Sequence, residues 1–109
     1  FIESTSVYQP ELTSHLLEAV KNDDSDGIRL AALKYLENSL PFIRKEMIDA
    51  LRYQQSMLVQ MTMISMLNND HPLKVEEIKL IRSMDNIDDR ILNNPLLKQN
   101  IKNSNRHEI

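Results

Sequence analysis

The chain of 109 residues suits one small domain, and its 41% hydrophobic and 27% charged content is ordinary for a globular fold. A single Gly leaves little material for hairpin turns or phosphate-binding loops. The absence of Cys excludes disulfides, thiolate catalysis and the usual structural zinc sites within this sequence. The 13 basic and 16 acidic side chains are mixed along the chain, so the net charge of −3 gives no electrostatic signature of nucleic-acid binding.

The chain begins at Phe1 and not at Met, so we expect it to be part of a longer protein. Residues 1–9 are predicted to be an N-terminal segment, extended or leading from an upstream region. Residues 10–102 are the predicted helical domain, and the polar residues 103–109 are expected to form a disordered tail. No stretch is long and apolar enough to span a membrane, so any membrane attachment would lie outside this sequence.

The first predicted helix begins at Pro10, because proline is tolerated in the first turn of a helix. Its apolar residues recur at helical spacing and mark one face: Leu12, Leu16, Leu17 and Val20. A polar run at 22–24 ends it, and Ser25 or Asp26 is expected to cap a second, more apolar helix. The apolar residues of that helix are Ile28, Leu30, Ala31, Ala32, Leu33 and Leu36.

A third helix follows Pro41, and a turn at 53–55 leads to Ser56, the expected cap of a fourth helix. The apolar residues of the third helix are Ile43, Met47, Ile48, Ala50 and Leu51. The stretch 56–67, SMLVQMTMISML, carries apolar side chains all round a helix. A helix of that kind is buried or spans a membrane, and this one is too short to span, so it is predicted to lie between neighbouring helices.

These helices form a repeat. Residues 16–36 align without a gap on residues 47–67. The offset between the two segments, called the repeat offset below, also separates Pro10 from Pro41 and Pro41 from Pro72.

The third copy is weaker. A helix after Pro72 is expected to use Leu73, Val75, Ile78, Ile81 and Met84. Residues 85–89 are predicted to be a turn or a frayed capping segment, and a last helix is expected to begin at Asn94 and Pro95 and to use Leu96, Leu97 and Ile101. Atypical terminal copies are expected in such arrays.

The phrase LLEAVKNDDSDGIRLAALKYL at 16–36 resembles a HEAT repeat, a pair of antiparallel helices joined by a short acidic turn. The resemblance covers about two-thirds of the chain. It implies an all-α fold, a short α-α superhelix or HEAT-like solenoid of about three helix pairs. It also implies a polar ladder between adjacent copies, for which Asp24 or Asp26 and Arg29 match the family positions. The second copy has Gln60 in place of the Arg, and Gln54 or Met57 in place of the Asp, so hydrogen bonds would replace ion pairs there.

More narrowly, residues 16–67 are similar to the C-terminal HEAT-like domain of bacterial membrane-anchored anti-sigma-like regulators. That resemblance implies the extracytoplasmic, periplasmic part of a larger regulatory protein; without it, a cytoplasmic location is expected. The sequence lacks the zinc-finger segment and the membrane helix of those proteins.

Catalytic and metal sites have little support in the sequence, and no cofactor is expected. His15, His71 and His107 lie far apart and lack a second ligand at helical spacing, which is typical of surface histidines. The acidic turn 23–27 loosely resembles a calcium loop, but Tyr35 stands where the distal Glu of that motif belongs, and helix capping explains the same residues.

Stacked helix pairs leave a concave face for a partner. The positions expected on it are Arg29, Lys34, Gln60 and Ser65, in which the repeat offset relates Arg29 to Gln60 and Lys34 to Ser65. The leading hypothesis is therefore a non-catalytic interaction or sensory domain that binds a protein or peptide. The alternatives are a nucleic-acid-binding helical repeat, which would need a basic stripe on that face, and a small enzyme or metal-binding domain.

Overall fold

The computed structural model describes residues 10–95 and Leu97, and every regular element in this part of the chain is helical. The predicted all-α class is confirmed. Within the described residues, six α-helices and two short 3₁₀ turns follow one another: α1 (Pro10–Asn22), α2 (Asp26–Leu36), η2 (Glu37–Ser39), α3 (Leu40–Ala50), η3 (Leu51–Tyr53), α4 (Met57–Asp70), α5 (Val75–Arg82) and α6 (Asp89–Leu92). None of the described helices is long and apolar enough to cross a lipid bilayer. The predicted segments 1–9 and 103–109 lie outside the described residues.

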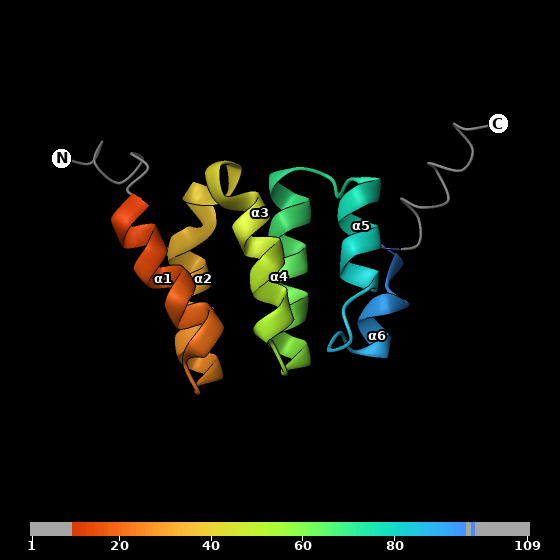
Figure 1. Cartoon of the computed structure of the whole chain (residues 1–109), viewed down its shortest axis with the longest axis horizontal. Coiled ribbons are helices and arrows are strands. Elements are labelled where there is room, and N and C mark those ends of the chain that lie inside the picture. Colours follow the sequence, from red (N-terminus) through yellow and green to blue (C-terminus); the bar gives the residue numbers. More distant parts are fainter. Residues whose placement is uncertain (1–9, 96, 98–109) are drawn as a thin grey trace.

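The helices form three antiparallel pairs that lie side by side along the longest axis of the molecule (Figure 1). The molecule is elongated and flat, with extents of 50 × 30 × 16 Å. Helix α1 packs against α2 and α3, whereas α4 packs against α2, α3 and α6. The odd-numbered helices therefore make one layer and the even-numbered helices make the other, with α4 in the middle of its layer.

The two predicted N-caps of the even-numbered helices are present. Ser25 Oγ accepts a hydrogen bond from the backbone N–H of Ile28 at 3.3 Å, and Ser56 Oγ accepts one from Val59 N–H at 3.4 Å. Each serine sits in extended backbone conformation just before its helix, which is the geometry an N-cap requires. Of the two candidates for the first cap, Ser25 and not Asp26 fills the role.

Helix α4 supplies much of the continuous core. Its buried residues are Val59, Gln60, Met63, Ile64, Met66 and Leu67. The prediction that α4 is buried on all sides is wrong at its first turn, where Met57 is 37% and Leu58 57% exposed. Burial of the helix is therefore incomplete where it begins.

A similar correction applies to α1. Leu17 and Val20 are buried as expected, but Leu12 is 53% exposed and Leu16 only half-buried. Leu16 packs against the edge of the core, whereas Leu12 stays exposed because the first pair has a neighbouring described pair on one side only.

The third pair was predicted least well. Helix α5 keeps the repeat offset, since its buried Ile78 and Ile81 are the equivalents of Met47 and Ala50. Residues 85–88 form the turn, but Asp89 begins the short helix α6, which the sequence did not indicate and which Asp88 caps. Pro95 and Leu97 are helical and Leu97 is buried, whereas Leu96 and Ile101 lie outside the described residues.

Candidate functional site

Two features of the structure are considered as candidate sites. One is a chain of polar side chains between the helix pairs, and the other is an open groove between α2 and α4. The polar chain, called the polar ladder below, consists of Arg29, Gln54, Gln60 and Asn86. Arg29 Nη1 donates to Gln54 Oε1 at 2.6 Å and to the carbonyl oxygen of Tyr53 at 3.1 Å. Its Nε donates to the carbonyl oxygen of Asp23. Arg29 thus joins the second pair to the end of α1.

Gln60 repeats this arrangement one pair further on. Its Nε2 donates to the carbonyl oxygens of Gln54 at 3.0 Å and Asn86 at 2.8 Å, while its Oε1 accepts from Asp88 N–H at 3.1 Å. Asn86 Nδ2 in turn donates to the carbonyl oxygens of Leu51 and Gln54, both at 2.7 Å. Arg29 and Gln60, related by the repeat offset, make equivalent links from one pair to the next.

The polar ladder satisfies backbone carbonyls at the ends of the odd-numbered helices. The last carbonyls of a helix have no partner within the helix. Gln54 Nε2 donates to the carbonyl oxygen of Val20 in α1 at 2.8 Å and to that of Ala50 in α3 at 3.0 Å. Gln54 is fully buried and Gln60 is 1% exposed, and no buried side-chain nitrogen or oxygen of the described residues lacks a partner. The ladder is a structural connection that fixes the register of the pairs.

Some of the residues expected in a ladder between copies lie in this polar ladder, and others do not. Arg29 and Gln60 were expected in the ladder and are in it. Asp24 and Asp26 were expected as its acidic partners, but both carboxylates are exposed, and a backbone carbonyl and Gln54 take that place. Asn86 was missed because the third copy is out of register with the first two. One repeat offset after Gln54 comes Asp85, and Asn86 is the next residue.

A second set of contacts between the pairs lies at the other ends of the helices, around Arg44 of α3. Its Nη1 and Nη2 donate to the carbonyl oxygens of Leu67 at 2.7 Å and His71 at 2.8 Å, at the end of α4. The same guanidinium pairs with Asp70 at 3.2 Å and with both carboxylate oxygens of Glu77 on α5 at 2.7 and 3.0 Å. Arg44 therefore joins three helices, and nothing in the spacing of the sequence indicated it.

The Arg44 cluster shifts the pKa values of its members. Burial raises the pKa of Glu77, but the hydrogen bonds from Arg44 and from Lys74 N–H and the charge of Arg44 outweigh it, so the pKa falls below 4.5. The hydrogen bond to Glu77 raises the pKa of Arg44 in spite of burial. The folded state thus favours the ionised pair.

Replacing Glu77 with Gln should lower the free energy of unfolding at neutral pH by about 1–3 kcal/mol, because Arg44 loses its charged partner. The folded pKa of Glu77 is depressed, so its contribution is complete above the unfolded pKa of about 4.5 and is lost as the pH falls through the folded pKa. Urea denaturation at a series of pH values should therefore show wild type and variant converging below about pH 4.5. Glu76→Gln, at an exposed neighbour, is the control, and a gap for Glu77→Gln that does not change with pH would contradict the assignment.

The groove, called the inner groove below, lies between α2 and α4 on the exposed side of the even-numbered layer. It is open to solvent and has a volume of about 250 Å³. Leu30, Leu33, Lys34, Glu37, Thr62 and Met66 line it. Apolar side chains make most of its floor, while Lys34 and Glu37 place one charge of each sign on the α2 wall. A groove of this kind can accept an apolar side chain and orient it by the flanking charges.

The structure separates the four residues expected on a concave face. Lys34 is exposed and lines the inner groove, and Ser65 is half-buried on α4. Gln60 is 1% exposed, and Arg29 donates hydrogen bonds to the neighbouring pair, so neither is free to line an exposed binding face. Arg29 and Gln60 occupy equivalent positions in two copies of the repeat, as the repeat offset indicated. Both positions lie in the contact between neighbouring pairs and not on an exposed face.

The other candidate residues have ordinary surroundings. His15 is exposed, and His71 Nδ1 lies 2.8 Å from the carbonyl oxygen of Pro72; His107 lies outside the described residues. In the acidic turn, Asp23 accepts a hydrogen bond from Ser25 N–H at 2.9 Å. No three His, Asp or Glu side chains of the described residues are grouped in a way that could hold a metal ion.

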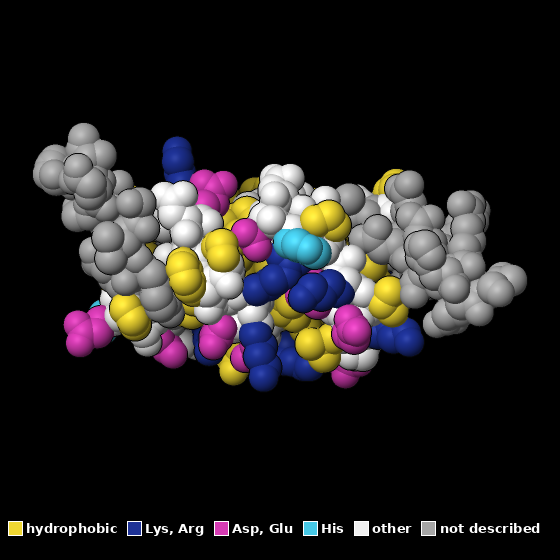
Figure 2. Space-filling model, turned by 90° about the horizontal axis from the view of Figure 1, so that it is seen from above, with side chains coloured by type: hydrophobic (Ala, Val, Ile, Leu, Met, Phe, Trp, Pro, Cys, Tyr) yellow, Lys and Arg dark blue, Asp and Glu magenta, His cyan; other side chains and the backbone are white. Residues whose placement is uncertain are grey.

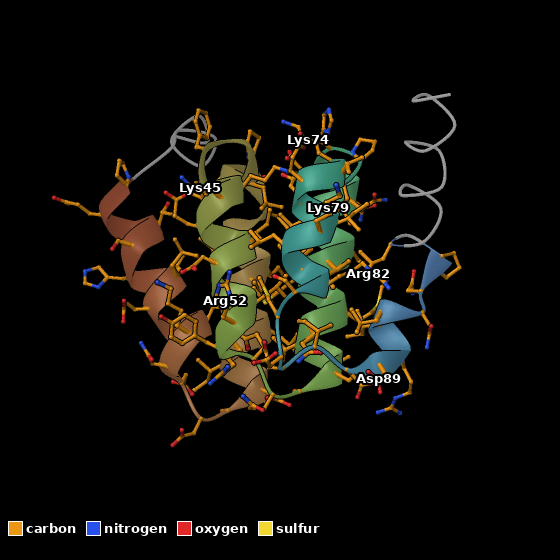
Figure 3. The ribbon with its side chains drawn as sticks, turned by 45° about the vertical axis from the view of Figure 1, so that its right-hand side comes forward. Lys45, Arg52, Lys74, Lys79, Arg82 and Asp89 are labelled. Atoms are coloured by element: carbon orange, nitrogen blue, oxygen red, sulfur yellow. The ribbon has the colours of Figure 1, made fainter. Side chains whose placement is uncertain are left out.

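Exposed basic side chains gather on the odd-numbered layer and along α5, with Lys45 and Arg52 beside α3 and Lys74, Lys79 and Arg82 along α5 (Figure 3). Acidic residues interrupt them, and Arg52 pairs with Asp49 at 3.6 Å. The end of the molecule seen in Figure 2 likewise mixes acidic, basic and hydrophobic side chains. The described residues therefore present no continuous basic stripe in these views.

Comparison with known proteins adds no relative: no family model, no curated protein and no solved structure matches the chain.

Proposed function

We propose that this chain is a HEAT-like helical repeat module that binds a protein partner, most directly an extended peptide, through the inner groove. The resemblance of residues 16–36 to a HEAT repeat supports the family proposal, together with three helix pairs and equivalent ladder contacts related by the repeat offset. No catalytic role is part of the proposal.

The observation that carries the binding role is the composition of the even-numbered layer. The groove is lined by the apolar side chains of Leu30, Leu33 and Met66, and Leu58, one helical turn before Thr62 on α4, is 57% exposed. An apolar groove that is open to solvent and has a few charged groups at its wall is typical of a binding site. Lys34 and Glu37 supply polar groups that could fix the direction of a bound peptide.

The test is selection of binding peptides from a displayed random library against the whole chain, followed by NMR mapping of the shifts that a selected peptide causes. The perturbed amides should cluster at Leu30, Lys34, Thr62 and Met66. Thr62→Lys, which places a charge in the groove without removing core volume, should weaken binding by at least about tenfold.

The control is Lys45→Glu, an exposed substitution on the odd-numbered layer, which should leave peptide binding unchanged. Shifts that cluster around Lys45 and α5 instead would contradict the proposal. A duplex DNA titration at low salt tests the nucleic-acid alternative, since binding that weakens steeply with added salt would favour it.

The role of the module in a larger regulatory protein, including an anti-sigma-like regulator, is proposed from the sequence resemblance alone. It is separable from the inner groove, because a peptide-binding helical module can serve many kinds of protein.

A further inference from the structure

The wall of the inner groove carries two charged side chains that the fold itself does not use. Lys34 lies in the last turn of α2 and Glu37 begins η2, so the two are neighbours on one side of the helix. Both are exposed, and within the described part of the chain neither side chain takes part in an ion pair or a hydrogen bond. The ammonium and the carboxylate are therefore available to a bound partner.

These charges are not a feature of the repeat. One repeat offset further on, Lys34 and Glu37 correspond to the neutral residues Ser65 and Asn68. Asn68 Oδ1 accepts a hydrogen bond from Leu73 N–H at 3.4 Å, so its side chain is used within the fold. The apolar positions of the floor, in contrast, stay apolar in the second copy, where Met61 corresponds to Leu30 and Ile64 to Leu33. Packing of the pairs thus requires the apolar floor but not the two charges.

The size and lining of the groove limit what it can recognise. Its volume of about 250 Å³ is below the range of about 300–1,000 Å³ that is usual for sites enclosing a small molecule, so it suits a single side chain of a larger partner. Thr62 Oγ1 donates to the carbonyl oxygen of Leu58 at 2.8 Å, which uses the donor of the only hydroxyl in the lining. The groups left to recognise the neighbours of a bound apolar side chain are Lys34 and Glu37.

We propose that Lys34 and Glu37 make the inner groove selective for peptides in which an apolar side chain lies between one acidic and one basic residue. This inference rests on the proposed function of the groove as a peptide-binding site. The acidic residue of the peptide meets the ammonium of Lys34, and the basic residue meets the carboxylate of Glu37. Two flanking residues of the same sign would bring like charges together at one of these positions, which disfavours the complex.

An extended peptide can make both contacts at once. Alternate side chains of an extended chain lie on the same face, so the residues two positions before and after the apolar side chain approach the same wall. Either order of the two charges satisfies the wall, because a peptide with the reverse order can bind in the opposite direction. The selected property is therefore one charge of each sign, and not a fixed order.

The test is selection from a displayed peptide library that has a fixed central Leu and random neighbours, carried out at low salt against the full chain and two variants. The wild-type chain should enrich peptides with one acidic and one basic flank. Lys34→Glu should instead enrich peptides with two basic flanks, and Glu37→Lys those with two acidic flanks. For a mixed-charge peptide from the wild-type selection, each variant should raise the dissociation constant by about threefold to tenfold, as expected for exposed ion pairs. Added salt should reduce this difference.

The matched controls are Lys45→Glu and Glu46→Lys, which make the same changes of net charge at exposed positions of α3, away from the groove. Both should keep the wild-type preference, and circular dichroism verifies the fold of every variant. Peptides that bind in the groove without a preference for charge overturn this inference and leave the proposed function standing. If no peptide binds any of the chains, both are overturned. A preference that the α3 controls change as much as the groove variants also overturns the inference, since it would reflect net charge alone.

Discussion

Replacing Ile64 with Ala is expected to lower the free energy of unfolding by about 2–5 kcal/mol. Ile64 is fully buried in α4, the helix that packs against α2, α3 and α6, so the cavity opens in the centre of the stack. Small domains have a free energy of unfolding of only about 5–15 kcal/mol in total, so this substitution should remove a large fraction of the stability. Chemical denaturation followed by circular dichroism measures the difference.

Lys34→Ala is the control, since Lys34 is exposed and its substitution should change the free energy of unfolding by less than about 0.5 kcal/mol. Equal effects of the two substitutions would show that α4 is not the central buried helix.

Replacing Gln60 with Leu should lower the free energy of unfolding by about 3 kcal/mol, although Leu is the more apolar side chain and has a similar size. The substitution removes both donors to the carbonyl oxygens of Gln54 and Asn86 and the acceptor for Asp88 N–H. A buried polar group that loses its partner costs about 1–3 kcal/mol, and part of that cost is relieved where water can enter at the partly buried contacts. Urea denaturation of the two proteins gives the value.

Gln55→Leu is the matched control for that change, because Gln55 is the same residue type and is exposed in the turn before α4. It should alter stability by less than about 0.5 kcal/mol. If Gln60→Leu proved neutral or stabilising, apolar packing would be sufficient at this position and the ladder would not contribute to stability.

The first two helix pairs could be predicted because the helix-capping residues and the apolar spacing indicated the same helices in both copies of the repeat. Ser25 and Ser56 each precede a helix at the same place in the repeat, and both are N-caps in the structure. Helix α6 was missed because so short a helix gives no helical periodicity; its signal was the single cap Asp88, displaced by one position from the repeat. Exposure of Leu12 was missed because a helical apolar pattern identifies a face but not whether a neighbour covers it.

The candidate site was less predictable for a related reason. The repeat offset relates Arg29 to Gln60, but it cannot say whether that shared position faces solvent or the next pair. The inner groove depends on how α2 and α4 approach each other, which brings Leu33 and Thr62 together across different helices. Arg44 meets Glu77 from a different helix pair, and no pattern within either helix records that contact.

The central claim is that buried amide side chains lock neighbouring helix pairs in register. Hydrogen exchange of the side-chain amide protons, followed by NMR, tests it most directly. The Nε2 protons of Gln54 and Gln60 should exchange far more slowly than those of the exposed Gln55 in the same spectra. If all three glutamines exchanged at the same rate, the ladder would not exist in solution and the stacked arrangement built on it would be contradicted.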